Sequence, residues 1–239
     1  MGKKVSPIAF RLTTNRTWQS HWWGGKRTPQ FLAEDEAIRE FIFDSVERST
    51  VRDVEITRNR NKVRVTINTA RPGILIGSKG SNIKKIEQHI ITILRNSAKK
   101  HSQDPATVRA NIEIKEIKDF ESHAALLADD IAQQLERRVA FRRVAKQTLN
   151  KVERNPAIKG CKIEMSGRLG GSEMGRNEKF FGKGSVPLQL MRGDIDYALA
   201  EAYTTYGTIG VKVWLYKGEK FGITKEKEME QPDPHGPRS

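Results

Sequence analysis

Two glycines set three positions apart, Gly77 and Gly80, constrain the fold of this chain more than any other feature of its sequence. They lie between Ile76 and Ile83, directly before a segment, Ser81 to Asn96, whose isoleucines recur at helical spacing. Glycine adopts backbone dihedral angles that other residues avoid, and it leaves room for another chain to approach. The pattern therefore predicts a tight loop that leads into the N-terminus of a helix.

The segments around this loop follow a set order of helix-like and strand-like patterns. A helix is expected where apolar residues recur every three or four positions, and a strand where they alternate with polar residues. The breaker Ala70 to Gly73 separates a predicted hairpin from a short helix that precedes the glycines. In chain order we expect a helix at Phe31–Arg48, strands at Val51–Thr57 and Lys62–Asn68, the short helix, a helix at Ser81–Asn96 and a strand at Val108–Lys115.

In the second half, two predicted helices precede a sheet. The apolar stripe of Ala124–Glu136 would bury Arg138 and Arg142 if that helix continued, and burying unpaired charges is costly. A new helix that begins at about Val139 removes this conflict. It ends at Asn155, because Pro156 follows. The strand-like runs that come next are Cys161–Ser166, Val186–Ala198 and Thr208–Leu215. We therefore expect an antiparallel sheet packed with two helices.

These patterns predict an α+β protein with two domains. The expected divisions are a basic and aromatic arm at 1–29, a first domain at 30–117, a second domain at 118–221 and a disordered, charged tail at 222–239. Within the arm, Trp18, Trp22 and Trp23 form either a small packed cluster or a surface that stacks on a partner, and we favour packing.

The charge of the chain points to a polyanionic partner. Its 239 residues include 43 Lys and Arg against 29 Asp and Glu, which gives a formal net charge of +14. A positive charge of this size attracts nucleic acid first and anionic membrane surfaces second. No apolar run approaches the roughly 18 residues that a membrane span requires, and no secretion signal is visible. We therefore expect a cytoplasmic protein without membrane contact.

Patterns typical of enzymes and metal sites are missing from the sequence. A single cysteine, Cys161, excludes a disulfide within the chain and a multi-cysteine zinc site. The five histidines are scattered and match neither a metal-binding nor a nucleophile motif. Asp194 and Asp196 alternate along a predicted strand, and we expect them to be solvated or to face RNA. The sequence thus predicts no enzyme, no cofactor and no metal.

The loop of Gly77, Ser78, Lys79 and Gly80 is a candidate RNA-binding element. The free N–H groups and the dipole of the helix that follows favour phosphate, and Lys79 adds a positive charge at the tip of the loop. Glycine pairs at this spacing also occur in turns that bind nothing. That alternative, a corner between two helices, stays open for the loop itself.

A second candidate is the basic strip, which we define as Arg142, Arg143 and Lys146 on the second helix of the second half. Arg142 and Lys146 are one helical turn apart and Arg143 is adjacent, so three cations share one exposed face. The alternative is a solvated face with ion pairs at i,i+4. However, Glu153 is the only carboxylate between Arg137 and Arg154, and clustered like charges repel. A polyanionic partner is therefore the favoured explanation.

The order of elements around the glycines resembles the KH domain of type II, with its extra helix and strand on the N-terminal side. In KH domains this loop clamps single-stranded nucleic acid. Further motifs resemble one family, bacterial-type small-subunit ribosomal protein three, over about Met1 to Phe221. Only the loop Ser97–Thr107 departs from it, by its length. The motifs that carry the resemblance are Gly2–Val5, Phe10–Leu12, Thr69–Gly73, Gln134–Arg138, Phe141–Arg143, Ser166–Gly171, Asp194–Tyr197 and Thr204–Gly207.

This resemblance implies a structural constituent of the small ribosomal subunit that binds rRNA in the head. It implies that the basic strip lines the channel through which mRNA enters the ribosome and holds the incoming mRNA single-stranded. The implied partners are rRNA, mRNA and the small-subunit proteins numbered ten and fourteen, with four and five near the mRNA entrance. The alternative within the binding class is a free-standing KH regulator that has no fixed place in a particle.

Further basic residues are predicted to bind rRNA. For Arg168 the alternative is a surface residue at a β-bulge, for the basic N-terminus it is a frayed end, and Arg71 before Pro72 is similarly open. The full set is Lys3, Lys4, Arg11, Arg71, Arg137, Arg138 and Arg168.

Overall fold

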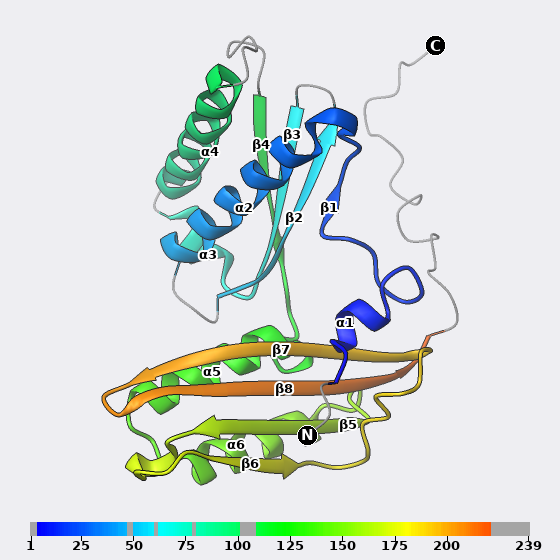
Figure 1. Cartoon of the computed structure of the whole chain (residues 1–239), viewed down its shortest axis with the longest axis vertical. Helices are drawn as coiled ribbons and strands as arrows, with labels where there is room; N and C mark the ends of the chain where they lie inside the picture. The colour runs from blue at the N-terminus through cyan, green and yellow to red at the C-terminus, as the bar shows by residue number, and fades with distance from the viewer. Residues whose placement is uncertain (1–3, 47–49, 60–61, 78–79, 101–108, 221–239) are drawn as a thin grey trace.

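The computed structural model describes residues 4–46, 50–59, 62–77, 80–100 and 109–220. Figure 1 shows two layered units, one above the other along the long axis of the molecule. The N-terminal unit has the sheet order β1-β2-β3-β4, and the C-terminal unit has the order β6-β5-β8-β7. The first helix, α1 (Pro7–Phe10), lies against β7 of the C-terminal unit (Figure 1). In the N-terminal unit the elements are β1 (Ser20–His21), α2 (Thr28–Ser45), β2 (Val51–Asn59), β3 (Lys62–Thr69), α3 (Pro72–Ile76), α4 (Ser81–Lys100) and β4 (Arg109–Glu116). In the C-terminal unit they are α5 (Ala124–Glu136), α6 (Phe141–Arg154), β5 (Gly160–Gly167), β6 (Arg176–Phe181), β7 (Gly193–Thr204) and β8 (Gly207–Glu219).

From α2 to β4, the N-terminal unit has the element order that the sequence predicted. β2 and β3 form an antiparallel hairpin that closes at Asn59 and Lys62, whereas β3 and β4 are parallel. A parallel pair needs a crossover connection, and here α3 and α4 provide it. Apolar residues alternate along β3 and recur at helical spacing on α2 and α4. Each element therefore has one apolar side, and these sides pack together. The resulting core includes Ile38, Ile42, Val63, Val65, Ile67, Ile86, Ile90 and Leu94.

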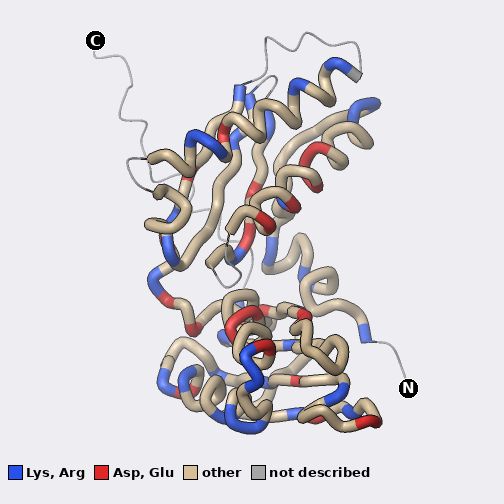
Figure 2. The backbone as a smooth tube through the Cα atoms, turned by 90° about the vertical axis from the view of Figure 1, so that its left-hand side faces the viewer, with Lys and Arg blue, Asp and Glu red and all other residues tan. Residues whose placement is uncertain are grey.

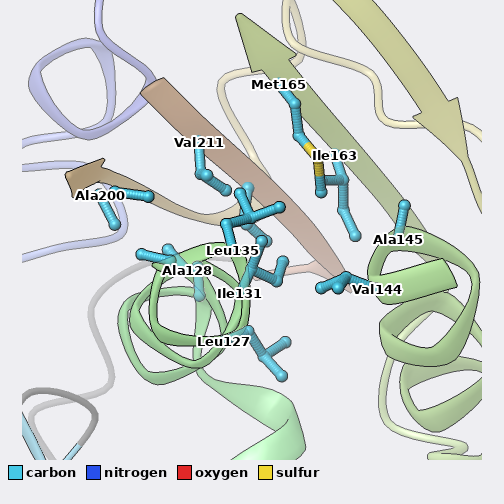
Figure 3. Close-up of a cluster of buried hydrophobic side chains, with 14 of the residues drawn as sticks. Leu127, Ala128, Ile131, Leu135, Val144, Ala145, Ile163, Met165, Ala200 and Val211 are labelled. Carbon is cyan, nitrogen blue, oxygen red and sulfur yellow. The ribbon is translucent and has the colours of Figure 1, made fainter. Parts of the chain in front are cut away.

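The C-terminal unit is an antiparallel sheet with α5 and α6 on one face. Figure 3 shows Leu127, Ile131 and Leu135 of α5 packed against side chains from the sheet. Val144 and Ala145 of α6 complete the same core. The predicted break between the two helices is confirmed, because α5 ends at Glu136 and α6 begins at Phe141.

Two strands of this sheet differ from the prediction. β7 begins at Gly193, not at Val186, because the segment before it turns around Arg11, which binds the backbone carbonyls of Leu188 and Leu190. β6, at Arg176–Phe181, was not predicted at all. Most of its side chains are polar or exposed, so it lacks the alternating apolar signal of a half-buried strand.

The predicted N-terminal arm is folded against both sheets. Ser20–His21 forms β1, which pairs in parallel with β2, and the indole N–H of Trp22 donates to Asp35 Oδ2 at 2.7 Å. Packing is therefore confirmed for Trp22, which also meets Phe31 edge to face. It is wrong for the other two tryptophans, since Trp18 is 62% and Trp23 is 93% exposed.

Asp194 and Asp196 are buried, which corrects the expectation that they are solvated or face RNA. Asp196 Oδ1 accepts a hydrogen bond from Arg16 at 2.7 Å, and Oδ2 accepts one from the backbone N–H of Ala124 at 2.9 Å, at the start of α5. Burial alone would raise the pKa of Asp196, but Arg16 and the Ala124 N–H outweigh it, so the pKa is lowered. This carboxylate therefore fastens the arm and α5 to β7.

The predicted disordered tail at 222–239 and most of the long loop Ser97–Thr107 lie outside the described residues. Within the described part of the chain, none of the helices combines the length and the apolar character needed to cross a bilayer.

Candidate nucleic-acid interface

The two glycines frame the corner between α3 and α4, as predicted. Gly77 ends α3 with φ +68° and ψ −177°, and Gly80 precedes α4 with φ +75°. The side chain of Asn82 braces the corner, because its Nδ2 donates to the carbonyl of Ile74 at 3.1 Å. Ser78 and Lys79 lie outside the described residues. The described part of the loop thus has the backbone geometry that required glycine.

Alanine at Gly77 should destabilise the N-terminal unit by about 1 to 3 kcal/mol, because only glycine readily adopts its dihedral angles. An added Cβ would also lie 2.7 Å from Cγ of Asn82. At Gly80 the strain of the positive φ acts alone, since a Cβ there meets nothing within 4 Å, and the expected cost is about 1 kcal/mol.

Gly73, which has open space and no positive φ, is the matched control for urea unfolding of the three variants. Gly73→Ala should be neutral or slightly stabilising, because alanine is favoured in a helix. A cost at Gly77 no larger than that at Gly73 would contradict the role assigned to the corner.

The basic strip lies on the outer face of α6. Val144, Leu149 and Val152 are buried against the sheet, and the helical period then turns Arg142, Arg143 and Lys146 outward. All three are exposed, and the side chain of Arg142 is 70% exposed. Neither Arg143 nor Lys146 forms an ion pair with any residue that the structure describes. In Figure 2, blue segments of Lys and Arg recur along the C-terminal unit, with red ones between them.

β6 adds a fourth cation and one carboxylate that the sequence did not reveal. Arg176 Nε lies 2.9 Å from Glu178, and Arg142 Nη2 lies 3.7 Å from the same oxygen. The guanidinium groups of Arg142 and Arg176 lie over the ring of Phe141, at 5.6 and 5.5 Å from its centroid. We expected almost no carboxylate near the basic strip, and Glu178 corrects that expectation. One shared and partly exposed carboxylate does not neutralise two arginines and the two cations beside them.

The register of β6 is what brings these residues to α6. Pairing of Gly167 with Arg176 and of Met165 with Glu178 sets β6 at the edge of the sheet. The only sign of this arrangement in the sequence is that Arg176 and Glu178 stand two positions apart, just before Phe180 and Phe181.

The predicted rRNA-binding residues have different surroundings. Arg168 is exposed, but its guanidinium donates to the carbonyls of Ser172 and Tyr206 at 2.9 and 3.3 Å, so it also braces its own loop. Arg137 and Arg138 are exposed in the turn between α5 and α6, where Arg138 has φ +63°. Arg71 is exposed at the start of α3, and Lys4 is exposed, whereas Lys3 lies outside the described residues.

Arg11 is a correction to the predicted set. It is 1% exposed, and its guanidinium donates to four backbone carbonyls, those of Pro7, Leu188, Leu190 and Gly193, at 2.7 to 3.0 Å. Four of its five N–H donors are thus directed into the protein. Arg11 is therefore an internal connection between the arm and the C-terminal unit, and it does not present its charge to rRNA.

Two family models match the chain, one in each unit. The KH domain model matches residues 37–122, and the model of the ribosomal protein S3 C-terminal domain matches residues 131–215. Curated relatives named small ribosomal subunit protein uS3 match over most of their length. The chain is 46% identical to the relative from Desulfovibrio desulfuricans over 232 residues, which cover 97% of this chain and 100% of the relative. It is 44% identical to the one from Exiguobacterium sp. (92% and 94% covered) and 43% identical to the one from Campylobacter hominis (97% and 96% covered).

The resemblance predicted from the motifs is confirmed by these matches, as is the KH domain in the N-terminal unit. With identity above 40% over nearly the whole of both chains, this chain belongs to the family of the small ribosomal subunit protein uS3.

Proposed function

We propose that this protein binds small-subunit rRNA in the head of the ribosome and that its basic strip holds incoming mRNA single-stranded at the channel entrance. Membership of the uS3 family makes the chain a structural, non-enzymatic constituent of the small ribosomal subunit in the cytoplasm, as the sequence predicted. The family also favours this over the free-standing KH regulator. The finer placement on rRNA and mRNA rests on the charges described above.

The single observation that carries the mRNA role is the exposed and unbalanced charge on α6. Arg142, Arg143 and Lys146 project from a helix whose other face is fixed in the core, and Glu178 is shared with Arg176. Such a surface is more stable against a phosphate chain than against water alone. Holding RNA there favours its unpaired form, because a single strand can present its phosphates and bases to the basic strip. The effect is passive and involves no bond chemistry.

For rRNA we propose the loop of Gly77, Ser78, Lys79 and Gly80 together with a basic set on both units. The free N–H groups at the start of α4 and the glycine backbone suit close phosphate contact. The remaining set is Lys3, Lys4, Arg71, Arg137, Arg138 and Arg168. The neighbours that we propose are the small-subunit proteins numbered ten and fourteen, and numbers four and five near the mRNA entrance. We also propose domain limits at 30–117 and 118–221, with 1–29 as an arm and 222–239 as a tail.

Replacing Arg142, Arg143 and Lys146 by alanine should leave assembly intact but slow translation of messages with a stable hairpin after the start codon. We expect a several-fold loss on such a message and little change on an unstructured one, because the strip acts only on the unpaired state. The measurement is the ratio of the two reporter yields in cells that contain only the variant.

The matched control removes three exposed cations at the far end of the N-terminal unit, Lys62, Lys99 and Arg109. This control should sediment with small subunits and retain the wild-type ratio. An unchanged ratio for the strip variant in fully assembled particles would refute the mRNA role.

A further inference from the structure

Helix α2 carries an outer face that the fold does not use. Leu32, Glu36, Glu40, Phe43 and Asp44 recur at spacings of three and four along it, and we call these five residues the acidic face. Leu32 is 60% and Phe43 is 47% exposed, and the three carboxylates are exposed as well. The opposite side of the helix holds Ile38 and Ile42 in the core. In Figure 2, α2 bears red bands along its length.

The charge of this face is opposite to that of the protein as a whole. The chain has a net charge of +14, yet the exposed described positions of α2 contain no lysine or arginine, and its one arginine, Arg39, is half-buried and donates to Ser20 Oγ at 2.6 Å. Glu36, Glu40 and Asp44 form no ion pair with any described residue. They are therefore not needed to neutralise a cation of the fold. Their repulsion of phosphate makes this face a poor surface for RNA.

Leu32 and Phe43 also expose apolar surface to water, which is unfavourable. Single exposed apolar residues are common on protein surfaces. Here Leu32 and Phe43 lie eleven positions apart, about three helical turns, so they point from nearly the same side of α2 at a separation of about 16 Å. Carboxylates lie between and beside them. Apolar side chains at both ends suit burial against a protein, and the carboxylates beside them suit the cations of such a partner.

We propose that the acidic face of α2 docks a basic neighbouring protein in the small subunit, through a segment that combines lysine or arginine with apolar side chains. The proposal rests on the proposed placement in that particle. Charge complementarity selects this occupant, since RNA, anionic lipid and a second copy of the same face would each meet like charge. A helical or extended segment that spans about 16 Å would reach both Leu32 and Phe43.

The test introduces the photoreactive residue p-benzoylphenylalanine in place of Phe43 in the full chain. Small subunits isolated from cells that carry this variant are irradiated, and adducts at position 43 are identified after separate nuclease and protease treatment. We expect an adduct that resists nuclease, is removed by protease and contains a lysine- and arginine-rich peptide of another ribosomal protein. In a second variant that also carries Glu36→Gln, Glu40→Gln and Asp44→Asn, the yield of that adduct should fall at least threefold.

An adduct with RNA at position 43 would overturn the inference, as would the absence of any adduct in particles that contain the chain in full amount. An undiminished yield after removal of the three charges would also overturn it. Failure of the chain to sediment with small subunits would instead overturn the proposed function, so the two failures are distinguishable. The charge-neutral variant should bind single-stranded RNA in isolation at least as tightly as wild type.

Discussion

Replacing Arg58 by methionine is expected to destabilise the N-terminal unit by about 3 to 5 kcal/mol, because it leaves two buried carboxylates without their counter-charge. Arg58 on β2 pairs with Glu34 and Asp35 of α2, and the three side chains are at most 6% exposed. Asp35 also accepts hydrogen bonds from Ser20 and Trp22 of the arm. Losing Arg58 therefore loosens α2, the sheet and the arm together. Urea unfolding followed by tryptophan fluorescence measures the loss.

An exposed arginine of the neighbouring strand provides the matched control. Arg64 on β3 lies 3.3 Å from Glu113, but its side chain is 61% exposed, so Arg64→Met should cost less than about 1 kcal/mol. Adding Glu34→Gln and Asp35→Asn to Arg58→Met should recover part of the stability, since no buried charge then remains unpaired. A single-variant loss as small as that of Arg64→Met would show that the cluster does not hold the unit together.

Replacing Arg11 by methionine should cost about 3 kcal/mol or more, since each hydrogen bond from a charged donor contributes about 1.5 to 3 kcal/mol. Its four carbonyl acceptors belong to the arm, to the segment before β7 and to Gly193 at the start of β7, so the change should release the arm from the C-terminal unit. Burial lowers the pKa of Arg11, yet a guanidinium stays charged at any ordinary pH. Arg11→Lys should be intermediate, because one ammonium cannot reach all four carbonyls.

Limited proteolysis distinguishes this internal role from an rRNA contact. Cleavage within the arm should accelerate in Arg11→Met and remain at the wild-type rate in Lys4→Met, because Lys4 is exposed. If Arg11→Met instead weakened RNA binding while the arm stayed protected, the internal role would be wrong.

The main elements of the fold could be predicted because their apolar residues follow one period over many positions. The stripes of α4 and α5 and the alternation along β3 each define a buried face without knowledge of the partner. The break before α6 was predictable for a related reason, since continuing α5 would have buried Arg142. In these segments local pattern and tertiary packing agree.

What the sequence did not reveal depends on contacts between distant segments. β1 forms because Ser20 pairs with Ile56 of β2. β6 forms at the edge of the sheet through pairing with β5 alone. Arg11 and Asp196 looked like surface charges, since their partners lie far away in the chain. A charge buried by a partner more than 170 positions away leaves no local signal.

The same distinction applies to the candidate interface. The basic strip was predictable, because helical spacing alone places Arg142 and Lys146 on one face of α6. Arg176 and Glu178 were not, because only the register of β6 on β5 brings them there. The acidic face of α2 was likewise hidden, because which side of a helix faces the sheet decides which carboxylates remain exposed.

The proposed joint action of Arg142, Arg143 and Lys146 on one phosphate chain is tested most directly by the salt dependence of RNA binding. For the isolated full chain and a single-stranded oligonucleotide, log affinity should fall against log salt with a slope of about −0.7 per phosphate neutralised. Alanine at all three positions should flatten that slope by about 2, whereas the Lys62, Lys99 and Arg109 control should leave it nearly unchanged. A strip variant with the wild-type slope, or a control that flattens it equally, would contradict the claim.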